Sequence, residues 1–224
     1  RFYKDTDPIS VINDLIKISS PQSDEKTIFI WPEGILPNIS KDQLREYKFL
    51  FKNEFNENHI LSIGINDIKK EGQIIKYYNS LTIYNHNLEI LNSYNKVNLV
   101  PFGEFLPFEK LLRKFGFKKI TEGYGSFLKG SSQNSIKIEN LNILPLICYE
   151  IIFTSLTQKT NQNTNLIINI SEDGWFGKSI GPKQHFSHSV FRAIENGKYV
   201  IRSANNGVAA VINPLGEIEQ KINF

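Results

Sequence analysis

The stretch LPLICYEIIF, residues 144–153, places the only cysteine of the chain between two apolar runs. The first run belongs to NILPLICY (142–149), which has the apolar composition of a buried strand, and EIIFTSLTQ (150–158) is predicted to be a helix. A thiol at such a strand-to-helix junction faces the positive end of the helix, which stabilises a thiolate and can hold an oxyanion. On local evidence alone, the simpler interpretation of Cys148 is a small buried hydrophobic residue.

Apolar runs of this kind recur along the chain and alternate with helical patterns. Helices are expected after a capping box formed by Ser40 and Gln43, and between Pro182 and Gly197. The alternation is typical of an α/β layered domain. With 224 residues, 40% of them hydrophobic, one large domain over residues 1–224 is expected. The predicted strands cover residues 27–31, 60–66, 80–85, 142–149, 165–170, 199–204 and 207–213.

The composition excludes several classes of protein. The formal net charge is only +3, and the lysines are dispersed among acidic residues, which argues against a nucleic-acid-binding protein. A single cysteine cannot form an internal disulfide, and no cluster of Cys and His has the spacing of a zinc site. The longest apolar stretches are shorter than the roughly 18 to 20 residues that a spanning helix needs. The single thiol therefore remains to be explained.

Three strand-like runs adjoin a side chain suited to catalysis. Glu33 follows IFIW and a proline that ends the strand, and Cys148 ends the strand described above. Lys96 and Glu104 bracket a short apolar run that ends in Pro101 and Gly103. Each of them alone is more simply interpreted as a surface charge or a core residue. Because open α/β sheets present their sites at strand ends, we expect the three to meet. Together, a base, a cation and a thiol are the parts of a Glu-Lys-Cys acyl-transfer site.

Six segments resemble the carbon-nitrogen hydrolase (nitrilase) superfamily and occur in its order. Within the superfamily they look most like the apolipoprotein N-acyltransferases, mainly through LVPFGEFLPF, CYE and the residues around WFG. The resemblance implies a four-layer α-β-β-α sandwich. The six segments are WPEG (31–34), KVNLVPFGEFLPF (96–108), LICYE (146–150), DGWFG (173–177), PKQH (182–185) and RAIENGKYVIRSANNGVAAVINPLGE (192–217).

The resemblance also implies roles for individual residues. Glu33 matches the general base, Lys96 the lysine that stabilises the oxyanion, and Cys148 the nucleophile. Other matched positions support these residues or lie near the substrate; they are Glu104 and Glu150 as supporting glutamates, and Tyr149 and Trp175 as substrate-binding aromatic residues.

One motif departs from the pattern of the family. Where Asn-Asp-Ala usually precedes Trp-Phe-Gly, this chain has Glu172, Asp173 and Gly174. The hydrogen bonding next to Trp175 is therefore expected to differ from that of the family, whereas the three catalytic positions match it.

The activity that the resemblance implies is a two-stage acyl transfer. A fatty acyl chain would pass from a phospholipid, with phosphatidylethanolamine as the expected donor, through a Cys148 thioester to the α-amine of the diacylglyceryl cysteine of an apolipoprotein. No metal or organic cofactor is needed. Members of the family carry spanning helices on both sides of this domain, so the chain is expected to be excised from a protein of the bacterial inner membrane and to face the periplasm.

Two alternatives remain at this point. In a soluble nitrilase-type amidase, water rather than an amine would resolve the thioester of Cys148. A catalytically inactive binding module would be expected to lack a member of the triad, but Glu33, Lys96 and Cys148 are all present.

Two further features have competing interpretations. The segment 101–119 interleaves Phe and Leu with Lys and Arg, which suits contact with a membrane surface as well as an amphipathic core helix. His185 and His188 stand three residues apart, as a metal pair would, but no third ligand lies within reach in the sequence. A hydrogen bond near the site is the expected role of His185.

Overall fold

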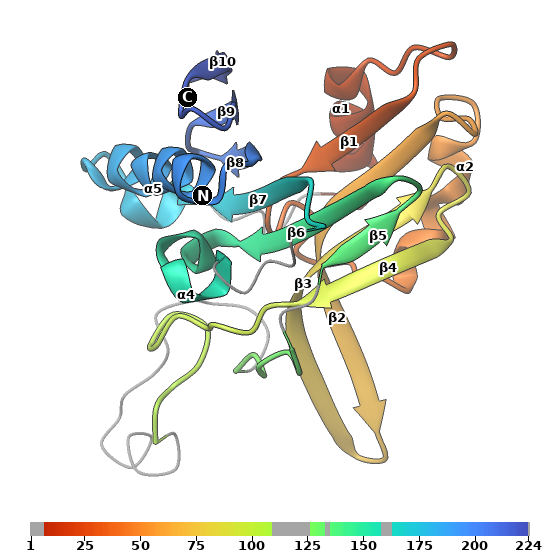
Figure 1. The fold of residues 1–224 in the computed structure, drawn as a ribbon. Helices are drawn as coiled ribbons and strands as arrows, with labels where there is room; N and C mark the ends of the chain where they lie inside the picture. The colour runs from red at the N-terminus through yellow and green to blue at the C-terminus, as the bar shows by residue number, and fades with distance from the viewer. Residues whose placement is uncertain (1–6, 109–125, 133–134, 158–162, 224) are drawn as a thin grey trace.

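The first of two β-sheets is built from the N-terminal part of the chain (Figure 1). The computed structural model describes residues 7–108, 126–132, 135–157 and 163–223. The strands of this sheet lie in the order β1-β2-β3-β4, with β1 parallel to β2 and the other pairs antiparallel. Its elements are α1 (Pro8–Ser19), β1 (Thr27–Trp31), η1 (Gln43–Tyr47), α2 (Lys48–Phe51), β2 (His59–Glu71), β3 (Ile74–Asn85) and β4 (Ile90–Asn95), where η marks a 3-10 helix.

The second sheet follows in the chain and has the strand order β10-β9-β8-β7-β6-β5. Its central strands β6, β7 and β8 are parallel, and the outer pairs are antiparallel. Its elements are β5 (Ile136–Ile138), β6 (Leu141–Ile147), η2 (Cys148–Ile152), α4 (Thr154–Thr157), β7 (Leu166–Glu172), η3 (Asp173–Phe176), α5 (Gly181–Asn196), β8 (Tyr199–Asn205), β9 (Ala209–Ile212) and β10 (Ile218–Ile222).

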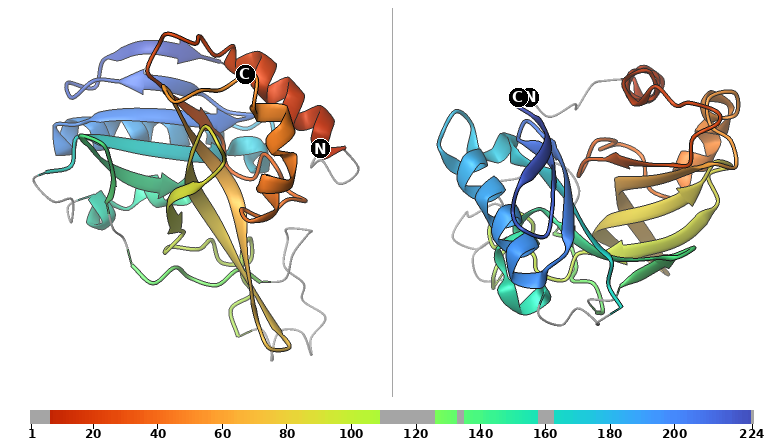
Figure 2. Two further views of the ribbon diagram at one scale, coloured as in Figure 1. Left: turned by 90° about the vertical axis from the view of Figure 1, so that its right-hand side faces the viewer. Right: turned by 45° about the horizontal axis from the view of Figure 1, so that its top comes forward.

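The two sheets face each other, and helices cover their outer sides. Figure 2 shows α1 and α5 on opposite sides of the molecule with both sheets between them. Alternate residues of each strand point to opposite faces, so the side chains of one strand can pack in two different cores. On β6, Leu144 and Leu146 pack in the core shared with α5, whereas Ile143 and Ile147 pack with Leu81 of β3 between the sheets. The expected α-β-β-α sandwich is therefore confirmed.

A third core lies under the N-terminal helices. Ile12 and Ile16 of α1 pack there with Leu61, Ile63 and Ile65 of β2. All of them are buried, so one face of α1 packs against the first sheet. Among the residues that the structure describes, no helix combines the length and the hydropathy needed to cross a membrane.

Most of the predicted elements are confirmed. Ser40 and Gln43 form the expected capping box, with hydrogen bonds of 3.0 and 3.4 Å, although the helical turns that follow are short. Helix α5 ends at Asn196, and Gly197 caps it with a φ of 59°. All seven predicted strands are present, and β2 and β3 extend beyond the predicted bounds into a long hairpin (Figure 1).

The prediction of one regular helix after Cys148 was wrong. The chain makes a 3-10 turn, η2, then becomes extended at Phe153, and α4 follows as a single short turn. The carboxylate of Glu150 accepts the backbone N–H of Ile147 at 2.9 Å, which ties the turn back on its own start. The positive end of a regular α-helix is therefore not available to Cys148.

Candidate active site

The ends of β1, β4 and β6 bring Glu33, Lys96 and Cys148 together, as the sequence predicted. Nζ of Lys96 lies 3.6 Å from Oε1 of Glu33 and 2.9 Å from Oε2 of Glu104. Cys148 interacts electrostatically with Glu33 and with Lys96. The first two residues come from one sheet and the cysteine from the other, so the site exists only where the sheets face each other.

Glu33 is held by both sheets. Its Oε1 accepts a hydrogen bond of 2.7 Å from the side chain of Asn79 on β3, and its Oε2 accepts one of 2.9 Å from the backbone N–H of Glu172 on β7. The loop that carries Glu33 lies directly on Gly64 of β2, where a Cβ would approach the carbonyl oxygen of Pro32 to 2.4 Å. Only glycine at position 64 permits this approach.

Glu104 is the partner of both Lys96 and Asn79. Its Oε1 accepts a hydrogen bond of 2.7 Å from the side chain of Asn79, which therefore bridges Glu104 and Glu33. The other oxygen of Glu104 accepts the backbone N–H of Val100 at 2.9 Å. Asn79 could not be predicted from the sequence, because a single polar residue in a strand gives no signal of its own.

Lys96 is buried yet charged. Burial alone would lower its pKa, but the carboxylates of Glu104 and Glu33 more than offset this, and its pKa is raised above the usual range. A permanently charged ammonium group in a buried site is suited to stabilising an oxyanion.

Cys148 has an unusual backbone conformation and an unusual thiol. Its φ is 50°, a left-handed conformation that residues other than glycine rarely adopt. Burial raises the pKa of the thiol to about 12; Glu33 adds to the rise, while Lys96 and a hydrogen bond with Ser171 oppose it. The expectation that a helix end stabilises a resting thiolate was therefore wrong, because the turn is short and the surroundings are apolar and acidic.

Glu150 connects Cys148 to the loop that carries Lys96. Its Oε1 accepts hydrogen bonds from the hydroxyl of Tyr94 and the backbone N–H groups of Val97 and Asn98, at 2.8, 2.8 and 3.0 Å. Because these residues directly flank Lys96, Glu150 fixes the lysine relative to the cysteine two positions away. Burial raises the pKa of Glu150, although these hydrogen bonds and Lys96 act in the opposite direction.

The two aromatic residues that the family places near the substrate lie beside the strand ends. Tyr149 is half-buried in η2, with its ring 5.1 Å from that of Phe153 in an edge-on contact. Trp175 lies in η3 at the end of β7 and is 46% exposed. An exposed indole at the edge of a buried site is suited to contact with an apolar ligand.

The departure from the family pattern consists of two residues, Glu172 and Gly174, whose sizes fit each other. The carboxylate of Glu172 caps η3 by accepting the N–H of Gly174 at 2.7 Å, and it also accepts the side chains of Asn205 and Asn206 at 2.5 and 3.1 Å. A Cβ on Gly174 would lie 2.5 Å from Oε1 of Glu172. The longer Glu172 and the smaller Gly174 therefore belong together.

Both ring nitrogens of His185 take part in hydrogen bonds below the site, which confirms its expected role. They contact Asp173 at 2.9 Å and the carbonyl oxygen of Cys148 at 3.2 Å. Ser171 and Arg202, which the sequence did not predict, complete the same buried network. Within the described ranges, no three His, Cys, Asp or Glu side chains are grouped as metal ligands would be.

Comparison with known proteins identifies the family. The profile of the family described as carbon-nitrogen hydrolase matches residues 26–222. The chain belongs to the carbon-nitrogen hydrolase family. Its sequence is similar to the apolipoprotein N-acyltransferase of Rickettsia typhi, with 40% identity over 216 residues, or 95% of this chain and 42% of that protein. The corresponding protein of Rhodopseudomonas palustris is 44% identical over 205 residues, or 88% of this chain and 38% of that protein.

Solved structures of the carbon-nitrogen hydrolase type share the fold. A carbon-nitrogen hydrolase from Helicobacter pylori matches with a TM-score of 0.69 and 14% identity, covering 96% of this chain and 80% of that one. A mutant of the amidase from Nesterenkonia sp. AN1, with acrylamide added at its active-site cysteine, matches with a TM-score of 0.63 and 16% identity, covering 96% and 82%. The chain spans less than half the length of the acyltransferases it resembles.

Proposed function

We propose that this chain is the catalytic domain of an apolipoprotein N-acyltransferase. The observation that carries the proposal is the meeting of Glu33, Lys96 and Cys148 at three strand ends, in a chain 34 to 44% identical to eight proteins of that name. The donor would be a phospholipid such as phosphatidylethanolamine, and the acceptor the diacylglyceryl cysteine of an apolipoprotein.

In the first stage, Glu33 removes the proton of Cys148 while the sulfur attacks the acyl ester carbonyl. The raised pKa of the thiol suits a proton transfer that accompanies the attack, rather than a stored thiolate. The ammonium group of Lys96 stabilises the oxyanion that develops on the carbonyl oxygen. Glu33 then returns the proton to the leaving oxygen, so that a lysophospholipid departs and a thioester remains.

In the second stage, the free α-amine of the acceptor attacks the thioester. Glu33 takes a proton from the amine and passes it to the sulfur as the C–S bond breaks, which forms the amide and restores the thiol of Cys148. In the amidase alternative, water would attack the same thioester, so the acceptor is what distinguishes the two functions.

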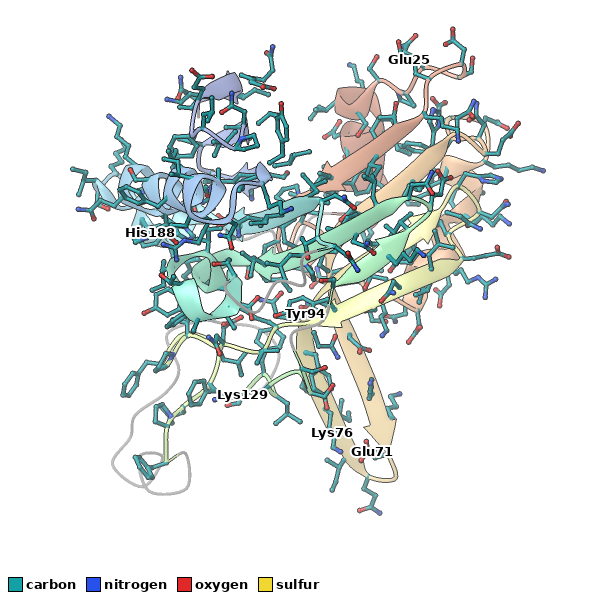
Figure 3. The ribbon with its side chains drawn as sticks, viewed as in Figure 1. Glu25, Glu71, Lys76, Tyr94, Lys129 and His188 are labelled. Atoms are coloured by element: carbon teal, nitrogen blue, oxygen red, sulfur yellow. The ribbon has the colours of Figure 1, made fainter. Side chains whose placement is uncertain are left out.

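The lipid substrates imply contact with a membrane surface. At one end of the molecule, the loop 101–108 and the tip of the β2–β3 hairpin lie on the same side as Lys129 (Figures 1 and 3). The loop exposes Phe102 and Phe108, the latter by 83%, and the tip exposes Ile74 and Ile75. Apolar side chains with lysines nearby suit an anionic lipid surface. Residues 109–119 of the segment predicted to be interfacial lie outside the described residues.

We place the whole protein in the bacterial inner membrane, with this domain on the periplasmic side.

The test is intact-mass analysis of the protein, with whatever flanking sequence its gene encodes, after incubation with phosphatidylethanolamine. The expected product is one acyl adduct that hydroxylamine removes, that is absent in Cys148→Ala, and that disappears when a diacylglyceryl peptide with a free α-amine is added. An adduct that persists in Cys148→Ala would contradict the proposed nucleophile. Loss of the adduct to water at the same rate with and without the peptide would favour the amidase.

A further inference from the structure

A buried polar network lies directly beneath Cys148 on the α5 side of the second sheet. We call it the Asp173 network; its members are Asn169, Ser171, Asp173, His185 and Arg202, all of which are buried. None of these residues has a place in the acyl transfer described above, yet burying so many polar groups is costly unless each is bonded.

Asp173 is the centre of the network. Its Oδ1 accepts the hydroxyl of Ser171 at 2.7 Å and lies 2.9 Å from Nδ1 of His185. Nη2 of Arg202 contacts both carboxylate oxygens, at 2.9 and 2.7 Å. Although burial alone would raise the pKa of Asp173, its hydrogen bond with His185 and the charge of Arg202 hold that pKa below the usual range.

Arg202 is also held by hydrogen bonds to groups other than Asp173. It donates to the carbonyl oxygen of Val208 at 3.2 Å and to the side chain of Asn169, which in turn donates to the carbonyl oxygen of Leu146 at 3.1 Å. Gly207 closes the other side of Asp173, because a Cβ there would lie 2.1 Å from Oδ2. Asp173 is therefore held by hydrogen bonds on one side and packed against Gly207 on the other.

Both ends of the network reach the same residue. Nε2 of His185 lies 3.2 Å from the carbonyl oxygen of Cys148, which can only accept, so this nitrogen must carry a hydrogen. Ser171, whose hydroxyl donates to the same Asp173 oxygen, also acts on the Cys148 side chain, whose pKa it lowers. The backbone and the side chain of Cys148 are thus both connected to the carboxylate of Asp173, through His185 and through Ser171.

We infer that the Asp173 network is a positioning device that holds Cys148 in its left-handed conformation with the thiol directed at Glu33, and that His185 is the residue through which it acts. The φ of 50° would otherwise relax, because a residue with a Cβ is strained there. The inference rests on the proposed role of Cys148 as the nucleophile.

The test compares two substitutions that each keep a hydrogen-bond donor at the position of one ring nitrogen of His185. His185→Gln places an amide nitrogen near the position of Nε2, in reach of the Cys148 carbonyl, whereas His185→Asn places one near Nδ1, in reach of Asp173 only. We expect His185→Asn to slow the formation of the acyl-enzyme about 100-fold with little change in KM, and His185→Gln to stay within about fivefold of the wild type.

A second measurement does not depend on any acyl donor. The pH profile of the alkylation of Cys148 by iodoacetamide reports the pKa of this thiol. In His185→Asn the thiol should move away from Glu33, so its profile should shift to lower pH, whereas the profile of His185→Gln should match that of the wild type. The control is Ser189→Ala on the same helix, a buried hydroxyl without a hydrogen-bond partner among the described residues.

The outcomes separate the inference from the proposed function. If phospholipid leaves no adduct on the wild type, the proposed function fails, and the alkylation profiles still decide the inference. Equal impairment of His185→Gln and His185→Asn at equal stability to urea would overturn the positioning role. So would an alkylation profile of His185→Asn that coincides with that of the wild type.

Discussion

At the scale of single residues, the charge of Glu33 has two opposing effects on Cys148. As a base, the carboxylate can accept the proton of the thiol, but as a negative charge it raises the pKa of that thiol. A residue can therefore be needed for the reaction and still make the resting sulfur less reactive. The two effects can be separated by replacing the charge while keeping the shape.

Glu33→Gln should reduce acyl transfer and increase simple alkylation. Acyl transfer should fall about 100-fold or more, because the amide cannot accept the proton. The pKa of Cys148, about 12 in the wild type, should fall because a nearby negative charge is gone, so the thiolate fraction at a given pH increases. Iodoacetamide should therefore label Glu33→Gln faster than the wild type at about pH 9. Slower labelling in this variant would contradict the electrostatic arrangement.

Glu172 and Gly174 should behave as a coupled pair. Gly174→Ala should push the carboxylate of Glu172 off the N–H that it caps, because the new Cβ would lie 2.5 Å from Oε1. The expected cost in the free energy of unfolding is about 1 kcal/mol, as for other lost caps. In Glu172→Asn, whose shorter side chain is that of the family pattern, Gly174→Ala should be close to neutral. A double-mutant cycle in urea measures the difference, and additive effects would contradict the pairing.

At the scale of elements, the β2–β3 hairpin is the part that the sequence described least well. Its strands were predicted to stop at residue 66 and to resume at residue 80, but β2 continues to Glu71 and β3 begins at Ile74. The missing part is a two-stranded ribbon of mostly exposed residues, which does not show the alternation that a half-buried strand imposes. Helix α1 was also missed, although Asp7 caps it through its side chain and Pro8 opens it.

The hairpin tip should take part in binding to lipid. Ile74→Ser combined with Ile75→Ser should weaken binding to vesicles that contain phosphatidylglycerol several-fold, because two exposed apolar side chains are lost next to Lys69 and Lys70. The matched control is Leu215→Ser with Ile222→Ser, which removes two side chains that are 76% and 73% exposed in the C-terminal part of the second sheet. Cosedimentation measures the binding, and equal losses for both pairs would exclude a specific role for the tip.

At the scale of the whole molecule, the sequence could locate strand ends but not the side-chain contacts between neighbouring strands. Glu33 and Cys148 could be predicted because each follows or ends a predicted strand and matches a family motif. Lys96 could be predicted from its motif and the apolar run after it, although β4, the strand that precedes it, was not predicted. Asn79 and Arg202 could not, because each takes its role from a partner that is far away in the sequence, Glu104 for Asn79 and Asp173 for Arg202. Such pairings depend on which strands lie side by side in each sheet, which strand periodicity does not encode.

The hydrogen bond from Tyr94 to Glu150 crosses from the first sheet to the turn that follows the second sheet's β6, and its contribution should depend on pH. Burial raises the folded pKa of Glu150, so the stability that its protonated form contributes is present below the unfolded pKa and is lost as the pH rises through the folded pKa. The hydroxyl of Tyr94 limits that loss because it stabilises the charged form of Glu150. Tyr94→Phe should therefore cost about 1 kcal/mol at low pH, where Glu150 is protonated in both states, and about 2 kcal/mol above the raised folded pKa of Glu150, where the lost bond was to a charge. The control is Tyr84→Phe, an equally buried hydroxyl that donates to the carbonyl oxygen of Lys41 at 3.1 Å. Its cost in urea should be the same at both pH values, and a Tyr94→Phe cost that does not change with pH would show that Glu150 is neutral where the two sheets meet.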